Sequence, residues 1–211
     1  MTSRRRGAPR GSYTPEATRQ AIIDSALALF EKNGFHATSV QAVADHAKVT
    51  KGAFYHHFSS KEELLQIIHD EFVDYQLGEV RRIMETVDGP VEQLRQVIRM
   101  SVLSTVRFRS HVTVFFQERR YLHGERFAAI KAKRDEVTDE TRKIVKAGIA
   151  KGLFRKDADP TITTFGIVGM TAWSYQWLRP EGTKSPEEVA DQLADLVLGG
   201  LLTDRRKLRS R

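Results

Sequence analysis

Residues 38–61 of this 211-residue chain read TSVQAVADHAKVTKGAFYHHFSSK, and they constrain its fold more than any other stretch. Thr38 and Ser39 can each cap the start of a helix, and the apolar residues that follow recur on one helical face. A tight turn separates that helix from a second one, which Thr50 caps. The stretch therefore predicts two short helices joined by a turn, a helix-turn-helix motif at residues 39–58.

The second short helix has one apolar side and one polar side. Phe54 and Phe58 are four residues apart, so both rings face the core. The opposite side carries polar residues of the kind that contact DNA from the major groove. We expect Gln41, Lys51 and Gly52 to lie near bases, Ser39, Thr50, Tyr55 and Lys61 to hold phosphates, and His56 to do either.

The formal net charge of +7 is unevenly spread along the chain. Residues 1–61 hold nine Lys and Arg against four Asp and Glu, and residues 204–211 hold five against one. Such basic segments favour a phosphate backbone through counterion release, although basic termini are also often simply solvated. We expect a flexible basic arm at residues 1–14, a DNA-binding domain at 15–61, a ligand-binding and dimerisation domain at 62–203, and a basic tail at 204–211.

Composition and missing motifs exclude several other classes of protein. The chain has no Cys, which rules out disulfides and thiolate zinc sites and suits a reducing compartment. No apolar run approaches the roughly 18 residues of a membrane span, and the basic N-terminus lacks the apolar stretch of a signal peptide. No nucleotide-binding, hydrolase or zinc-protease motif occurs. We expect a cytoplasmic protein that is not an enzyme and holds no metal or cofactor.

Apolar residues recur at spacings of three and four through most of the chain, with capping residues, Gly or Pro at the breaks. The pattern predicts an all-α protein of about nine helices. Three form the N-terminal helix-turn-helix domain, and the rest form a C-terminal helical domain. The helices are expected at residues 15–33, 39–47, 50–58, 60–86, 90–106, 111–122, 125–150, 160–177 and 185–201.

The last two expected helices differ in character from the others. Residues 160–177 are apolar nearly all round, so this helix must be buried on several sides, and one chain of this size supplies few neighbours. Residues 185–201 carry a continuous apolar seam. We expect both helices to pair with their copies in a second subunit, although two internally packed helices would show the same pattern. The expected interface residues are Ile162, Phe165, Gly169, Val189, Leu193, Leu196 and Leu201.

Large aromatic residues in the C-terminal half lie near basic ones, including Lys131 and Arg134. This mixture suits an amphipathic anion in a helical pocket. Aromatic residues at helical spacing are also usual in a plain core, and basic residues are usual on a solvated face. The candidate pocket residues are Phe108, Phe115, Phe116, Arg119, Arg120, Phe127, Trp173, Trp177 and Arg179.

Residues 26–65, ALALFEKNGFHATSVQAVADHAKVTKGAFYHHFSSKEELL, resemble the signature of the TetR family of one-component bacterial repressors. The resemblance implies a homodimer that binds an inverted-repeat DNA operator and is released by a small lipophilic effector. The stretches HVTVFFQERRYLHGERF, KGLFRKDADP and AWSYQWLRPEG look like the subgroup that represses fatty-acid or sterol-ring degradation genes and responds to acyl-coenzyme A thioesters.

That second resemblance implies a long-chain acyl-coenzyme A as effector. Its nucleotide end is then expected at Arg119, Arg120 and Arg179, and its acyl chain toward Trp173 and Trp177. Two alternatives stay open. One is a TetR-like regulator of efflux or aromatic catabolism that responds to a drug or phenolic compound, and the other is a DNA-bound dimer without any ligand.

Overall fold

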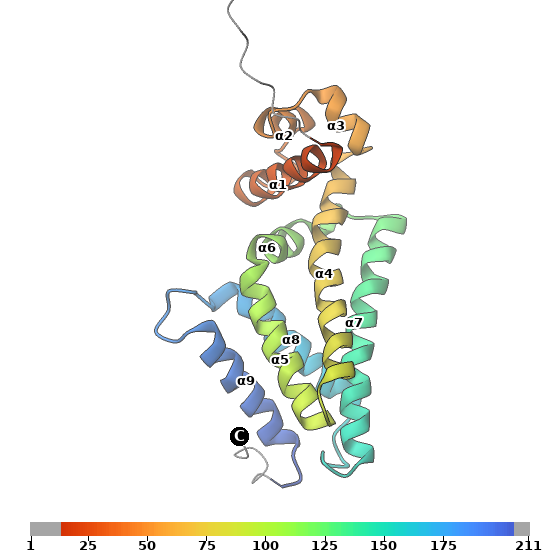
Figure 1. Ribbon diagram of the computed structural model, residues 1–211, viewed down its shortest axis with the longest axis vertical. Helices are drawn as coiled ribbons and strands as arrows, with labels where there is room; N and C mark the ends of the chain where they lie inside the picture. Colours follow the sequence, from red (N-terminus) through yellow and green to blue (C-terminus); the bar gives the residue numbers. More distant parts are fainter. Residues whose placement is uncertain (1–13, 205–211) are drawn as a thin grey trace, which may run out of the picture. The chain divides into compact units, whose positions relative to one another are not determined.

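The computed structural model describes residues 14–204 (Figure 1). Within this range the chain forms nine α-helices, one short 3₁₀ helix and one isolated bridge, with no named strand. The all-α prediction is therefore confirmed. The predicted basic arm and tail lie outside the described residues, apart from Thr14 and Asp204.

Two compact units divide the chain, the first ending at Leu64 and the second beginning at Leu65. The boundary predicted after residue 61 lies three residues earlier. Helix α4, Lys61–Thr86, therefore gives its first turn to the first unit and the rest of its length to the second. Across the described residues, no helix is both long enough and apolar enough to cross a membrane.

The first unit contains α1 (Pro15–Asn33), α2 (Val40–His46) and α3 (Lys51–His57), as the spacing of apolar residues predicts. Helix α1 ends at Gly34, whose φ of 82° is a left-handed conformation that a residue without Cβ adopts at little cost. The core side of each helix is fully buried. The main buried side chains of the first unit are Ile22, Ile23, Ala26, Phe30, Val43, Ala44, Phe54 and Phe58.

The second unit continues α4 and adds five helices and a 3₁₀ turn. These are α5 (Pro90–Arg107), α6 (Arg109–Glu118), the 3₁₀ helix (Arg119–Tyr121), α7 (Gly124–Ala150), α8 (Pro160–Trp177) and α9 (Pro186–Leu201). The single helix predicted over residues 111–122 is thus two elements, because the chain tightens into the 3₁₀ turn after α6.

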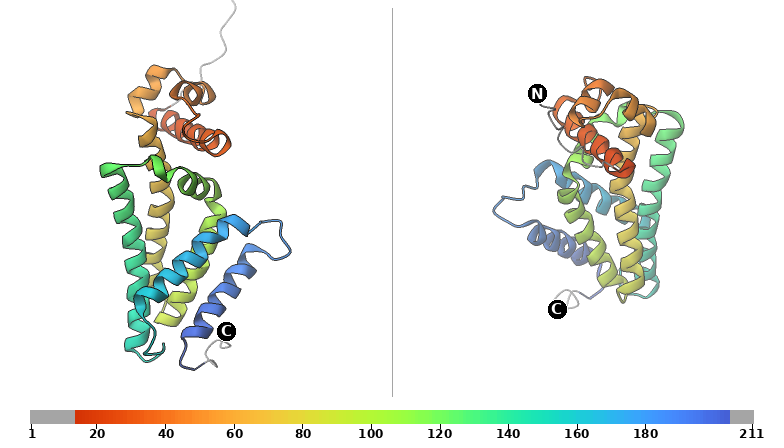
Figure 2. Two further views of the ribbon diagram at one scale, coloured as in Figure 1. Left: turned by 180° about the vertical axis from the view of Figure 1, so that it is seen from behind. Right: turned by 45° about the horizontal axis from the view of Figure 1, so that its top comes forward.

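Helix α5 lies at the centre of the second unit, with α9 on one side and α4 and α7 on the other, and Figure 2 shows the same order from behind. Leu94, Val97 and Ile98 of α5 are buried in the main core of this unit. Two ion pairs, Arg95–Asp195 and Arg99–Asp191, also join α5 to α9. Asp191 and Asp195 flank the buried side of α9, which carries Ala190, Ala194 and Leu198.

Candidate functional site

Side-chain caps hold the two short helices of the first unit. The Ser39 hydroxyl accepts a hydrogen bond from the Ala42 amide at 3.0 Å, and the Thr50 hydroxyl accepts one from the Ala53 amide at 3.0 Å. Lys48, in the turn between them, has a positive φ of 58°. Local sequence signals thus set both helix starts.

One side of α3 is open to solvent. Phe54 is fully buried, whereas Lys51, Gly52, Tyr55 and His56 are all exposed. Their exposure agrees with a helix that presents this side to a major groove, and the DNA contacts themselves stay a prediction. Gln41 on α2 is exposed too, and its amide donates to the Asp45 carboxylate at 2.8 Å.

Lys61 differs from the other predicted DNA contacts. Its Nζ donates to the carbonyl oxygens of Phe35 at 2.9 Å, Thr38 at 3.1 Å and His36 at 3.4 Å. The same ammonium lies 4.4 Å from the centre of the Phe35 ring. These contacts tie the start of α4 to the loop before α2, so they favour a positioning role for Lys61 over the predicted phosphate contact.

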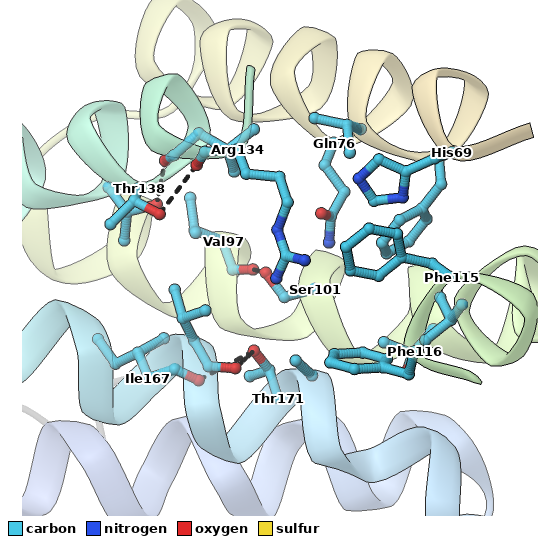
Figure 3. A pocket seen from close by; sticks show the side chains of 18 residues that line it. His69, Gln76, Val97, Ser101, Phe115, Phe116, Arg134, Thr138, Ile167 and Thr171 are labelled. Atoms are coloured by element: carbon cyan, nitrogen blue, oxygen red, sulfur yellow. Dashed lines mark hydrogen bonds between the residues drawn. The ribbon is translucent and has the colours of Figure 1, made fainter. Parts of the chain in front are cut away.

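The second unit contains a cavity of about 80 Å³ that is lined by α4, α5, α6, α7 and α8 (Figure 3). Its apolar walls include Val97, Phe115, Phe116 and Ile167. Its polar lining comes from four helices: His69 and Gln76 on α4, Ser101 and Thr105 on α5, Arg134, Thr138 and Thr141 on α7, and Thr171 on α8.

His69 is a buried, unpaired imidazole at this cavity. Its ring stacks on Phe115 with centroids 3.8 Å apart, and neither ring nitrogen has a hydrogen-bond partner. Burial lowers the pKa of His69 to about 3, and the positive charge of Arg134 adds to this effect. His69 is therefore neutral at physiological pH.

Arg134 brings a positive charge to the same cavity. Its guanidinium carbon lies 4.8 Å from the centre of the Phe115 ring and 5.9 Å from that of Phe116. Burial lowers the pKa of Arg134, and the nearby Arg119 lowers it further. Among the described residues, Arg134 forms no ion pair.

The structure corrects the assignment of Trp173 and Trp177 to the pocket. Both are exposed, by 59% and 48%, and neither lines the cavity. Helix α8 instead turns Ile167 and Thr171 toward the cavity. Of the predicted pocket residues, only Phe115 and Phe116 lie on the cavity wall.

The other predicted pocket residues lie elsewhere in the second unit. Arg119, Arg120 and Phe127 line a separate, open surface depression around the 3₁₀ turn. Phe108 packs against Tyr75, with ring centres 5.0 Å apart, and is not on the cavity wall. Arg179 is exposed beyond the end of α8 and lines neither space.

Sequence reasoning missed the contribution of α4 to the cavity. His69 and Gln76 lie in α4, where no pocket residue was predicted from the sequence. The signal was present, since His69 occupies a position on the apolar side of α4, four residues after Leu65 and four before Val73.

The buried side of α8 carries three hydroxyl side chains beside Ile167 and Tyr175, whereas its exposed side is largely apolar. Thr164, Thr171 and Ser174 are buried, and the Ser174 hydroxyl lies 2.7 Å from that of Thr105 on α5. Facing solvent instead are Ile162, 72% exposed, and Phe165, 57% exposed. Gly169 is exposed on this surface too.

The predicted interface residues on α9 differ in how exposed they are in the isolated chain. Leu196 is 67% exposed, as an interface residue should be in an isolated chain. Val189 and Leu193 are half-buried in the isolated chain, so their assignment to a subunit interface stays a prediction. Leu201 is buried in the core of its own chain, which corrects its assignment. The reason is the orientation of α9, which the pairing of Asp195 with Arg95 helps to set.

Comparison with protein families gives two matches that together cover most of the chain. Residues 22–68 match a family described as bacterial regulatory proteins, tetR family, and residues 87–201 match one described as a tetracyclin repressor-like C-terminal domain. The first match spans the helix-turn-helix unit, and the second spans most of the unit that holds the cavity.

Individual relatives match over nearly the full length. The repressor KstR2 of Mycolicibacterium smegmatis is 29% identical over 92% of this chain and 95% of its own, and KstR2 of Rhodococcus jostii is 31% identical over 87% and 90%. The structure of KstR2 of Mycobacterium tuberculosis, described as a ketosteroid transcriptional regulator, has 29% identity and a TM-score of 0.79 over 88% of this chain and 95% of that one. AibR, solved with isovaleryl coenzyme A and operator DNA, has 31% identity and a TM-score of 0.74 over 88% and 98%.

Proposed function

Because the chain belongs to the TetR family of bacterial regulatory proteins, we propose that it binds an inverted-repeat operator as a homodimer and leaves it when a coenzyme A thioester enters the cavity. As a TetR-type transcriptional repressor, the protein is a DNA-binding regulator and not an enzyme. It acts where bacterial DNA is, in the cytoplasm. The observation that carries the effector proposal is the cavity wall on α4, since the same helix begins in the DNA-binding unit.

In this proposal α3 reads the operator. Lys51 and Gly52 meet base edges together with Gln41, while Ser39, Thr50 and Tyr55 contact phosphates and His56 does either. The exposure of these residues supports the assignment. Two copies of α3 reach successive major grooves when a dimer holds them about 34–36 Å apart.

The homodimer forms through the outer surface of α8 and the exposed side of α9. The support is the inverted pattern of α8, since an apolar stripe containing Ile162 and Phe165 is costly in water and is usual at a subunit contact. Gly169 lets a second helix approach closely. Leu196 adds the apolar contribution of α9.

The effector is a thioester whose acyl group occupies the cavity. Its nucleotide phosphates meet Arg119 and Arg120 in the neighbouring depression. A cavity of about 80 Å³ is well below the roughly 300 Å³ of typical ligand pockets, which favours a compact acyl group over the long chain expected from sequence. The isovaleryl coenzyme A found on AibR, a relative of the same fold, supports this choice.

Release is a shift in the population of conformations. A ligand that fits better when α4 is displaced stabilises the arrangement in which the two copies of α3 no longer match the groove spacing. A coupling free energy of about 1–3 kcal/mol is enough to lower operator occupancy several-fold. The residues of α4 at the cavity, His69, Phe72, Val73 and Gln76, are the points where the ligand acts.

Selection of the operator from random DNA, followed by ligand release, tests the proposal. We expect an inverted repeat bound in the nanomolar range, and loss of fluorescence anisotropy when short-chain acyl-coenzyme A is added. The variant Lys51→Ala should relax sequence preference at one base pair per half-site by about 1–3 kcal/mol. Lys32→Ala, which removes the same charge from an exposed position on α1, should not.

Three results would count against parts of this proposal. Release by drugs or phenols with no response to thioesters points to the first alternative, and no response to any compound points to a ligand-independent dimer. Tight binding to a single half-site by a monomer contradicts the dimeric mode.

A further inference from the structure

Most hydrogen-bond donors at the cavity already donate to acceptors within the protein. The hydroxyls of Ser101, Thr138, Thr141 and Thr171 each donate to a carbonyl oxygen one turn earlier in their own helix. Gln76 donates to the Ser104 hydroxyl at 3.2 Å. These hydroxyls can still accept a hydrogen bond through their lone pairs, but they have no further proton to donate to a ligand.

Two strong donors at the cavity remain without an acceptor among the described residues. The Arg134 guanidinium projects into the cavity space together with the His69 ring (Figure 3), and it has no carboxylate partner. Neutral His69 has one ring N–H, and both of its nitrogens are unpaired. A ligand that fills this space must therefore offer acceptors to a positively charged donor and a neutral one.

We infer that Arg134 and His69 form a carboxylate-binding end of the cavity, so that the buried part of the effector is a compact apolar skeleton that ends in a carboxylate. A carboxylate matches the planar fork of a guanidinium with two parallel hydrogen bonds and neutralises its charge. A methyl-terminated chain leaves the Arg134 charge buried without a partner, which is unfavourable. The rings of Phe115 and Phe116, with Val97 and Ile167, enclose the apolar skeleton.

The inference rests on the proposed function for one point only, the coenzyme A half of the ligand. A buried carboxylate can come from a dicarboxylic acid joined to coenzyme A through its other end, or from a free carboxylic acid that enters the cavity alone. The two sources share the chemistry at Arg134 and differ in whether the thioester matters.

Matched ligands and variants of the full-length protein separate these sources. Succinyl-, glutaryl- and adipoyl-coenzyme A are compared with butyryl-, valeryl- and hexanoyl-coenzyme A, and the corresponding free monoacids and diacids are measured alongside by calorimetry. The variants are Arg134→Met, which keeps the stem and removes the charge, and Arg134→Lys, which keeps the charge. Lys131→Met removes an exposed charge from the same helix, one turn away from Arg134.

We expect the best dicarboxylyl thioester to bind about tenfold or more tightly than its methyl-terminated partner of equal length. Arg134→Met should remove this preference for the dicarboxylyl thioester, Arg134→Lys should retain part of it, and Lys131→Met should retain all of it. Circular dichroism and operator affinity without ligand should be the same for Arg134→Met and Arg134→Lys as for the wild-type protein, which would show that the fold is intact.

The failures are distinct. If both series of thioesters bind equally, or if Arg134→Met keeps the ratio, the carboxylate inference is wrong while the thioester proposal stands. If only free acids bind, and binding depends on Arg134, the carboxylate inference stands and the thioester proposal fails. If no member of either series binds, both are wrong.

Discussion

The Nζ atom of Lys61 lies 2.9 Å from the carbonyl oxygen of Phe35. It shares its remaining protons with two more carbonyls of the same loop, at His36 and Thr38. An ammonium that satisfies three carbonyl oxygens has little left for a phosphate. Lys61 therefore holds the loop that leads into α2, and its effect on DNA binding should pass through that loop.

Lys61→Met is expected to lower the free energy of unfolding by about 1–2 kcal/mol, because three backbone carbonyls lose a charged donor at a partly buried position. Operator affinity should fall for the same reason, while the slope of log K against log salt stays unchanged. Urea denaturation and binding titrations from 50 to 200 mM salt measure the two quantities. Lys32→Met is the exposed control. A slope reduced by about one with unchanged stability means that Lys61 contacts a phosphate after all.

Buried His69 should make stability depend on pH. The pKa of His69 falls to about 3 on folding, against an ordinary value of 6.5, so the unfolded chain takes up this proton first as pH drops. The stabilising contribution is therefore complete above pH 6.5 and is lost progressively as pH falls toward 3. Between pH 7.5 and pH 5 the loss from this group is about 2 kcal/mol.

His69→Phe should remove that loss, because the ring still stacks on Phe115 but no longer carries a titrating group or unpaired nitrogens. Urea denaturation of both proteins at pH 7.5 and pH 5 measures the change. We expect the advantage of the variant to be larger at pH 5. An equal difference between variant and wild type at both pH values would show that the imidazole titrates normally in the folded protein.

Gly148 leaves room for the Phe154 ring at the end of α7. A Cβ at this position would lie 2.1 Å from Cδ2 of Phe154, which is fully buried and cannot yield easily. Gly148→Ala is expected to destabilise the protein by about 1–3 kcal/mol. Gly78→Ala on α4, where a Cβ meets nothing, should stabilise it by up to about 1 kcal/mol. Thermal unfolding of the two variants distinguishes them, and equal effects would refute the steric argument.

Leu196→Glu places a charge on the exposed side of α9 without touching the core of its own chain. We expect the mass in solution to fall from that of two chains to that of one, 24.0 kDa, with operator binding weakened in parallel. Light scattering and anisotropy measure both. Ala129→Glu on an exposed side of α7 is the matched control. A Leu196→Glu protein that keeps the mass of two chains contradicts the proposed interface.

Local signals in the sequence predicted the helices and the reading unit well. The caps at Ser39 and Thr50, the left-handed stop at Gly34 and the paired rings of Phe54 and Phe58 all act within a few residues of one another. Such interactions are visible in the order of residues, so the helix-turn-helix motif needs no knowledge of the tertiary fold.

The cavity and the roles of Lys61 and the two tryptophans depend on distant contacts. An apolar helix gives no sign of which side packs inward, and in α8 the buried side is the one with Thr171 and Ser174, contrary to the usual rule. Trp173 therefore had no signal against its placement in the pocket. Lys61 likewise finds its acceptors 23 to 26 residues earlier in the chain.

The inverted helix α8 also bears on how the chain is made in a cell. Ile162, Phe165 and Trp173 are exposed in the isolated chain, and the proposed homodimer covers this surface, so a newly synthesised subunit is prone to aggregate until it pairs. We expect the melting temperature to rise as the protein is concentrated, and a scarce repressor to be cleared by proteases sooner than an abundant one. The number of copies that a bacterium maintains then has a lower limit set by this surface, independent of how tightly the operator is held.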